Sequence, residues 1–161
     1  MFFKKKIDVE DYCAGNLKAL FSPEREGTYE RLRQACADPA LTSADPKLYF
    51  DHIRAVVIQL LLVAITKSCT PDISSDGQVC VMIYLRQQAL SHIDTFRKIY
   101  NGAFGSQPQD GVAGMVEAFA REVTDSAIRP ETAQRLYVEF YAILPGLFQD
   151  FESIKLTSRR R

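Results

Sequence analysis

The segment 55–65 contains eleven residues, and Gln59 is the only polar residue among them. The chain approaches this run through Asp45 and leaves it after Thr70, each followed by a proline, as is common next to helix ends. A helix that is apolar on all sides has to be buried on all sides. We therefore predict a helix over 46–68 at the centre of the core, with other helices around it.

The same capping and proline signals divide the rest of the chain into helices. The run 79–85 is rich in β-formers, but its apolar spacing continues in a helical pattern, so we expect no strand. The predicted fold is an all-α, single-domain bundle of five to six helices, with a central antiparallel hairpin made by the second pair of helices. The helices expected besides 46–68 cover 9–21, 23–37, 75–101, 110–127 and 130–154, the last with a kink or break at Pro145-Gly146.

Charge is balanced overall but not along the chain. The 161 residues carry 20 basic and 20 acidic side chains. Seven of the basic residues lie in segments 1–6 and 155–161, which leaves 13 basic against 20 acidic residues in the body. We expect one domain over 1–161 with frayed basic ends at 1–7 and 155–161. Zero net charge disfavours a dedicated nucleic-acid binder, which usually carries a basic face.

The chain carries no sign of export or membrane insertion. Its first residues place two phenylalanines before three lysines, the reverse of the order in a secretory signal. The apolar run 55–65 is shorter than the roughly 20 residues that span a bilayer. The expected location is cytoplasmic.

The two histidines are the first candidates for chemistry because they titrate near neutral pH. Asp51 and Arg54 flank His52, and an antiparallel arrangement of 46–68 and 75–101 would bring His92 to the same end of the bundle. A polar pocket of Asp51, His52, Arg54 and His92 is therefore one hypothesis. The alternative is two partly buried histidines with local hydrogen bonds, next to a surface Asp–Arg pair.

Other catalytic and metal signatures are missing from the sequence. It has no Glu-x-x-His repeat, no Cys-x-x-Cys pair, no P-loop and no Gly-x-Gly-x-x-Gly pattern. Four cysteines and two histidines could supply a nucleophile and a base, but no local signature selects them. We therefore predict no catalytic, cofactor-binding or metal-ligating residue, and no cofactor.

Two surface patches could bind partners. Phenylalanines followed by lysines can rest on an anionic membrane, although such contact is weak for so few residues. The apolar face of 130–154 is broader than one neighbouring helix covers, so part of it could meet a second subunit. The candidate membrane or partner contact is Phe2, Phe3, Lys4, Lys5 and Lys6, and the candidate self-association face is Tyr137, Phe140, Tyr141, Phe148 and Phe151.

These observations favour a non-enzymatic helical interaction module that associates with itself or with another protein. One alternative is a helical bundle that binds a small molecule, or acts on it, near His52 and His92. Another is a peripheral membrane protein held by its basic ends. No transmembrane segment and no nucleic-acid partner are expected.

Overall fold

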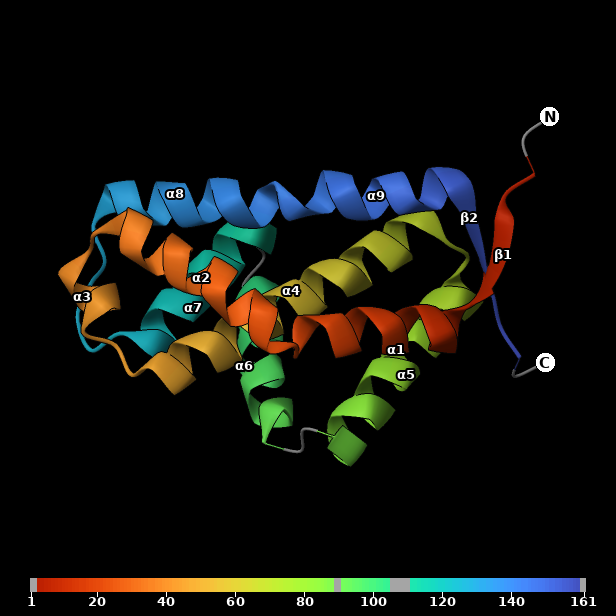
Figure 1. Ribbon diagram of the computed structural model, residues 1–161, viewed down its shortest axis with the longest axis horizontal. Coiled ribbons are helices and arrows are strands. Elements are labelled where there is room, and N and C mark those ends of the chain that lie inside the picture. Colours follow the sequence, from red (N-terminus) through yellow and green to blue (C-terminus); the bar gives the residue numbers. More distant parts are fainter. Residues whose placement is uncertain (1–2, 89–90, 105–110, 160–161) are drawn as a thin grey trace.

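The computed structural model describes residues 3–88, 91–104 and 111–159. Most of them are helical (Figure 1), which confirms the predicted all-α class. In chain order the elements are β1 (Lys5–Asp8), α1 (Val9–Leu20), α2 (Pro23–Cys36), α3 (Pro39–Thr42), α4 (Pro46–Ser68), α5 (Pro71–Gln88), α6 (His92–Phe104), α7 (Gly111–Val123), α8 (Pro130–Tyr141), α9 (Ile143–Ser153) and β2 (Ile154–Thr157).

The predicted helix over 46–68 forms as α4. Asp45 caps its first turn by accepting a hydrogen bond from the amide of Leu48, and Pro46 occupies the first helical position. Buried side chains occupy every face of the helix between Tyr49 and Ile65. It packs against α1, α2, α5, α6, α7 and α9, so its apolar surface is covered by elements from both ends of the chain.

α4 is longer than the apolar run 55–65, whose short length led us to expect no transmembrane segment. With 23 residues it has the length and apolar composition to cross a bilayer, contrary to the expectation from 55–65 alone. However, 72% of its most apolar window is buried inside the structure. Such burial is typical of a core helix in a globular domain, which passes the same test of length and composition.

The region predicted as one helix over 75–101 is two helices, and this part of the prediction is wrong. α5 begins at Pro71, soon after the end of α4 and before the predicted start at residue 75, because proline is favoured in the first turn of a helix. α5 ends at Gln88 and α6 begins at His92. Both pack on α4, and the central antiparallel hairpin expected from 46–68 and 75–101 is not confirmed.

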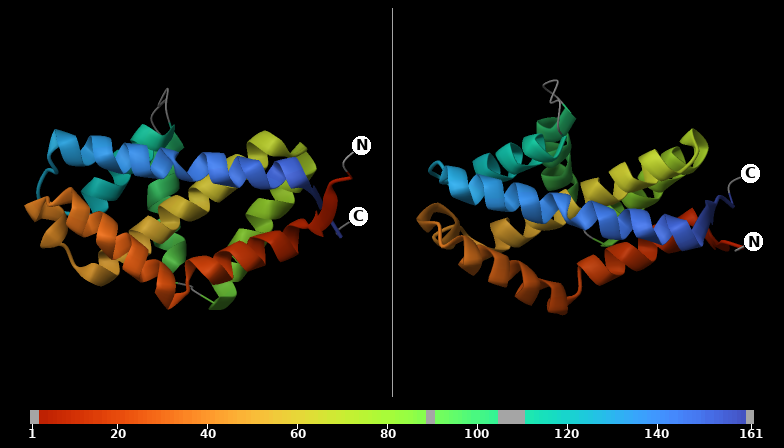
Figure 2. Two further views of the ribbon diagram at one scale, coloured as in Figure 1. Left: turned by 45° about the horizontal axis from the view of Figure 1, so that its top comes forward. Right: turned by 90° about the horizontal axis from the view of Figure 1, so that it is seen from above.

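The predicted break near Pro145 is confirmed and lies slightly earlier in the chain. Proline has no N–H, and its ring would collide with the carbonyl four residues back, here that of Tyr141. α8 ends at Tyr141 and α9 begins at Ile143. The two helices continue nearly in line along one side of the molecule, as both views of Figure 2 show.

The prediction that the chain has no strand is wrong. β1 and β2 form a parallel pair in which Lys5 lies opposite Ile154 and Asp8 opposite Thr157. The pair brings the two ends of the chain together at one end of the molecule (Figure 1). Arg159 reinforces it through ion pairs with Asp8 and Asp11. The parts of the basic ends in 5–8 and 154–157 are therefore paired rather than frayed.

Asp38 joins two distant parts of the chain. Ala37, before it, adopts a left-handed conformation with φ of 48°, and this turn ends α2. The buried Asp38 carboxylate accepts hydrogen bonds from the amide of Ala40 at 2.9 Å, the amide of Arg129 at 2.8 Å and the hydroxyl of Thr132 at 2.7 Å. One side chain thus caps α3 and holds the start of α8.

The ionised form of Asp38 is the one that these donors stabilise. Burial acts to raise the pKa of the carboxyl, but the hydrogen bonds from Arg129, Thr132 and Ala40 hold the pKa below its ordinary value. The stability that ionised Asp38 contributes is therefore complete above about pH 4, the pKa of an unfolded aspartate. It decreases as the pH falls through the lower folded pKa.

We predict that Asp38→Ala lowers the free energy of unfolding by about 2–3 kcal/mol at pH 7, because the amides of Ala40 and Arg129 and the hydroxyl of Thr132 lose their acceptor. Urea denaturation measures this loss. Asp125→Ala, at an exposed position, is the matched control and should change the free energy by less than about 0.5 kcal/mol. The difference between the two variants should shrink below about pH 4. Equal stability of both variants at pH 7 would contradict the role of Asp38.

Candidate functional site

Three of the four residues predicted to form a polar pocket come together around Asp51. His92 Nε2 lies 2.9 Å from Asp51 Oδ1, and Arg54 Nη1 lies 3.6 Å from the same oxygen. Lys47 donates to the other carboxylate oxygen from one turn earlier in α4. The histidine comes from α6, and the structure brings residues 51 and 92 together although the helix that carries His92 has other bounds than predicted.

Arg54 extends this polar group to the junction of α1 and α2. Its Nη2 donates to Glu26 Oε1 at 2.6 Å, and its guanidinium lies 5.4 Å from the centre of the Phe21 ring. His92 meets the same ring edge-on, with 5.0 Å between centroids. The group therefore fastens α1, α2 and α6 to α4. Neither Asp51 nor His92 lines any of the cavities described below.

Ser91 gives this group the composition of a serine triad without its geometry. Ser91 Oγ lies 3.4 Å from His92 Nδ1, while Asp51 occupies the other ring nitrogen. An activated nucleophile normally lies within about 2.6–3.2 Å of its base. Ser91 is also the exposed neighbour of His92 in the chain, which makes the contact a local one. The arrangement favours a structural role.

His52 does not join the predicted pocket. Its Nδ1 lies 2.8 Å from the carbonyl oxygen of Leu48, so Nδ1 carries the proton and donates it along α4. Its Nε2 is buried and has no hydrogen-bond partner within the described residues. Burial holds the pKa of His52 below its ordinary value, despite the opposing effects of the Leu48 carbonyl and the Glu122 carboxylate. His52 is therefore a core residue with a neutral imidazole ring.

The predicted N-terminal contact patch is partly incorporated into the fold. Lys4 donates to the carbonyl oxygen of Phe151 in α9. Lys5 and Lys6 are exposed residues of β1, and Phe3 is 92% exposed. Phe2 lies outside the described residues.

The predicted self-association face divides into buried and exposed parts. Phe140 and Phe151 are buried in the core, so they cannot meet another subunit without opening the fold. Tyr137 and Phe148 are half-buried, and Tyr141 is 52% exposed. Val138, which the sequence analysis did not select, is 53% exposed. The patch Tyr137, Val138, Tyr141 and Phe148 is what this face presents to solvent.

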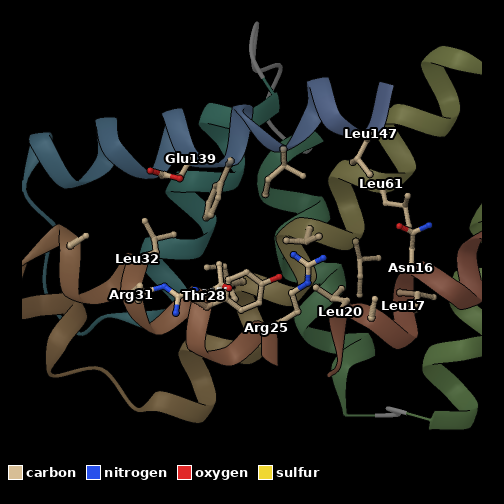
Figure 3. Close-up of a pocket in the computed structure, with 18 of the residues that line it drawn as sticks. Asn16, Leu17, Leu20, Arg25, Thr28, Arg31, Leu32, Leu61, Glu139 and Leu147 are labelled. Carbon is tan, nitrogen blue, oxygen red and sulfur yellow. Dashed lines mark hydrogen bonds between the residues drawn. The ribbon is translucent and has the colours of Figure 1, made fainter. Parts of the chain in front are cut away.

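A cavity of about 460 Å³ lies between α1–α2 and α8–α9, with α4 as its floor (Figure 3). Its walls are largely aliphatic, and side chains of all five helices face it. The volume is within the roughly 300–1,000 Å³ typical of small-molecule sites. Its apolar lining residues are Leu17, Ala19, Leu20, Leu32, Ala35, Ile53, Val57, Ile58, Leu61, Phe140, Ile143 and Leu147.

The charged groups around this cavity are mostly basic. Arg135 of α8 donates to the carbonyl oxygen of Ala35 at 2.9 Å, which joins α8 to the end of α2, and Arg31 donates to the hydroxyl of Thr28 at 3.2 Å. Figure 3 shows the guanidinium of Arg25 directed into the opening. The Arg25 backbone amide donates to Ser22, but within the described part of the chain its guanidinium makes no hydrogen bond or ion pair. Glu139 is the one acidic residue of the described lining.

Sequence reasoning missed this cavity, although one signal was present. The apolar face of 130–154 is broader than a single neighbour covers, from which the sequence analysis infers that part of it could meet a second subunit. Part of that surplus surface, at Phe140, Ile143 and Leu147, lines the cavity instead. α2 lies opposite and buries only Tyr29 and Arg33, so it lacks the large apolar side chains that would fill the space.

Among the described residues, no group of three His, Cys, Asp or Glu side chains is placed to hold a metal ion. Comparisons of the chain with protein-family models, curated proteins and solved structures found no match.

Proposed function

We propose that this protein is a non-enzymatic helical binding module, organised around α4, which holds a single-chain amphiphile with an anionic head group. A long-chain fatty acid is the simplest ligand of this class. The observation that carries the proposal is the aliphatic cavity between α1–α2 and α8–α9 with the unpaired guanidinium of Arg25 directed into its opening.

The lining of the cavity matches the two parts of such a ligand. Burying an aliphatic chain against leucine and isoleucine side chains is favourable by about 25 cal/mol for each Å² of apolar surface removed from water. An anionic head group near Arg25, Arg31 and Arg135 would meet three cations against the single carboxylate of Glu139. Arginine suits a carboxylate or phosphate because its planar donors bind two oxygens at once.

The placement of the titratable groups favours binding over catalysis. Asp51, Arg54 and His92 do not line this cavity, and each is occupied by its own contacts. The cavity lining, as far as the structure describes it, includes no histidine, cysteine or aspartate. Of the groups common in general acid–base catalysis, the described lining contains Glu139 and Tyr29 alone, and burial raises the pKa of Tyr29.

Binding of laurate tests this proposal. We predict that the protein binds laurate in isothermal titration and that Arg25→Gln weakens binding about fivefold, because one exposed charge-assisted contact is lost. Dodecanol, which has the same chain without the charge, should bind more weakly and be unaffected by Arg25→Gln.

Arg86→Gln is the matched control, since Arg86 is an exposed residue of α5 that lines none of the cavities described here. It should leave laurate affinity unchanged. Absence of laurate binding, or equal weakening by both substitutions, would contradict an anionic amphiphile in this cavity.

Self-association through α8 and α9 is a second candidate function. The exposed patch Tyr137, Val138, Tyr141 and Phe148 borders a hollow of about 480 Å³ lined by α4, α7, α8 and α9. Tyr137 and Tyr141 stack with 5.9 Å between ring centroids, which gives the patch a rigid aromatic surface. Because Tyr137, Tyr141 and Phe148 also line the hollow, an isologous dimer would bring the two copies of this apolar surface face to face.

For this candidate we predict that the parent protein dimerises at micromolar concentration and that Val138→Lys makes it monomeric, because a charge would be buried in the contact. Sedimentation velocity reports the change. Val79→Lys, at a 39% exposed valine on α5, is the matched control and should still dimerise. A monomeric parent at all concentrations would rule out this candidate.

The remaining expectations stay predictions. A cytoplasmic location and weak contact of the basic N-terminal residues with an anionic membrane are compatible with the fold. The exposed side chain of Phe3 is the feature that supports membrane contact.

A further inference from the structure

Gln59 is the one polar residue within the apolar run 55–65 of α4, and its side chain is only 3% exposed. Its Oε1 atom is buried and has no hydrogen-bond partner among the residues that the structure describes. Nearly all buried polar groups in folded proteins are paired, because an unpaired buried acceptor has lost its water without replacement. An orphaned acceptor at this position therefore requires an explanation.

Gln59 is one of the residues that line a second cavity, of about 450 Å³, between α4, α5 and α6. Leu62, Val63, Val81 and Met82 form its aliphatic walls. Two aromatic rings complete them, Phe96 and Tyr100 of α6, whose centroids are 6.4 Å apart. The other lining residues are Thr66, Lys67, Gln78 and Arg97, all of which are exposed.

We propose that this cavity binds a small aromatic molecule that carries one N–H or O–H group, of the indole or phenol class, and that Gln59 accepts its hydrogen bond. The ligand supplies the donor that Oε1 lacks. The terminal torsion of a glutamine side chain is broad, so a modest rotation of the amide turns Oε1 toward a donor in the cavity.

The walls of the cavity favour an aromatic ring as the apolar part of the ligand. Aromatic rings pack well against other rings at about 4.5–7 Å and against the sulfur of methionine, which Phe96, Tyr100 and Met82 provide. An apolar wall with one buried acceptor binds a molecule with a single donor and discriminates against the analogue that lacks it.

This site is independent of the amphiphile cavity because the two lie on opposite faces of α4. Ile53, Val57, Ile58 and Leu61 face the amphiphile cavity. Gln59, Leu62, Val63, Thr66 and Lys67 face the aromatic one, and the helical repeat of 3.6 residues places the two sets about half a turn apart. Either site can therefore exist without the other.

Indole fluorescence provides a direct measurement, because the chain has no tryptophan to obscure it. The parent protein is titrated against indole and against 1-methylindole, which has the same rings but no N–H donor. We expect saturable binding of indole and about tenfold weaker binding of 1-methylindole, the factor that one hydrogen bond contributes. Equal affinities in the parent protein, or no binding of indole at millimolar concentration, would overturn the proposal.

Two variants locate the effect. Gln59→Leu keeps the size of the side chain and removes the unpaired acceptor, so it should fold at least as stably as the parent and bind indole no better than 1-methylindole. Leu62→Phe narrows the cavity and should weaken both ligands together. Arg25→Gln and added laurate act on the other face of α4 and should leave indole affinity unchanged. Retention of the tenfold preference in Gln59→Leu would contradict the assignment to Gln59.

Discussion

The burial of α4 is the constraint on which the rest of this structure depends. Its apolar residues occupy every face, and no single neighbour can cover a helix of that kind. Helices from both ends of the chain therefore surround it, and β1 pairs with β2 where those ends meet. The two cavities arise from the same constraint, since they lie where the covering helices leave opposite faces of α4 incompletely filled.

Polar contacts at a few points, rather than tight apolar packing, connect the helix pair α1–α2 (the α1–α2 arm) to α8–α9 and keep the two pairs apart. Near one end of the arm, Tyr12 donates to Asp150 at 3.0 Å. At the other end, Asp38 accepts from the Arg129 amide just before α8, and Arg135 of α8 donates to the carbonyl oxygen of Ala35. Between these points Arg54 fastens the α1–α2 junction to α4. Contacts placed in this way fix the arm without closing the space behind it, which is how a small helical domain can keep an apolar cavity.

The sequence predicts those features whose causes are local. The helix over 46–68, its cap at Asp45 and the break near Pro145 follow from periodicity and from the chemistry of single residues. The pairing of β1 with β2 could not be predicted, because four-residue strands are too short to show an alternating pattern and their partners lie at opposite ends of the chain. The Asp51–His92 contact was within reach, but the cavities depend on which apolar surfaces remain uncovered, and only the packed structure decides that.

Native-state hydrogen exchange measures the central position of α4 most directly, because amides of the last element to open exchange only through global unfolding. Our account predicts that the amides of 53–65 are the slowest in the protein and exchange with the full free energy of unfolding. The amides of α2, which buries only Tyr29 and Arg33, should exchange through local opening, at a free energy below that of global unfolding. Exchange of the α4 amides as fast as those of α2 would contradict the view that the fold is built around this helix.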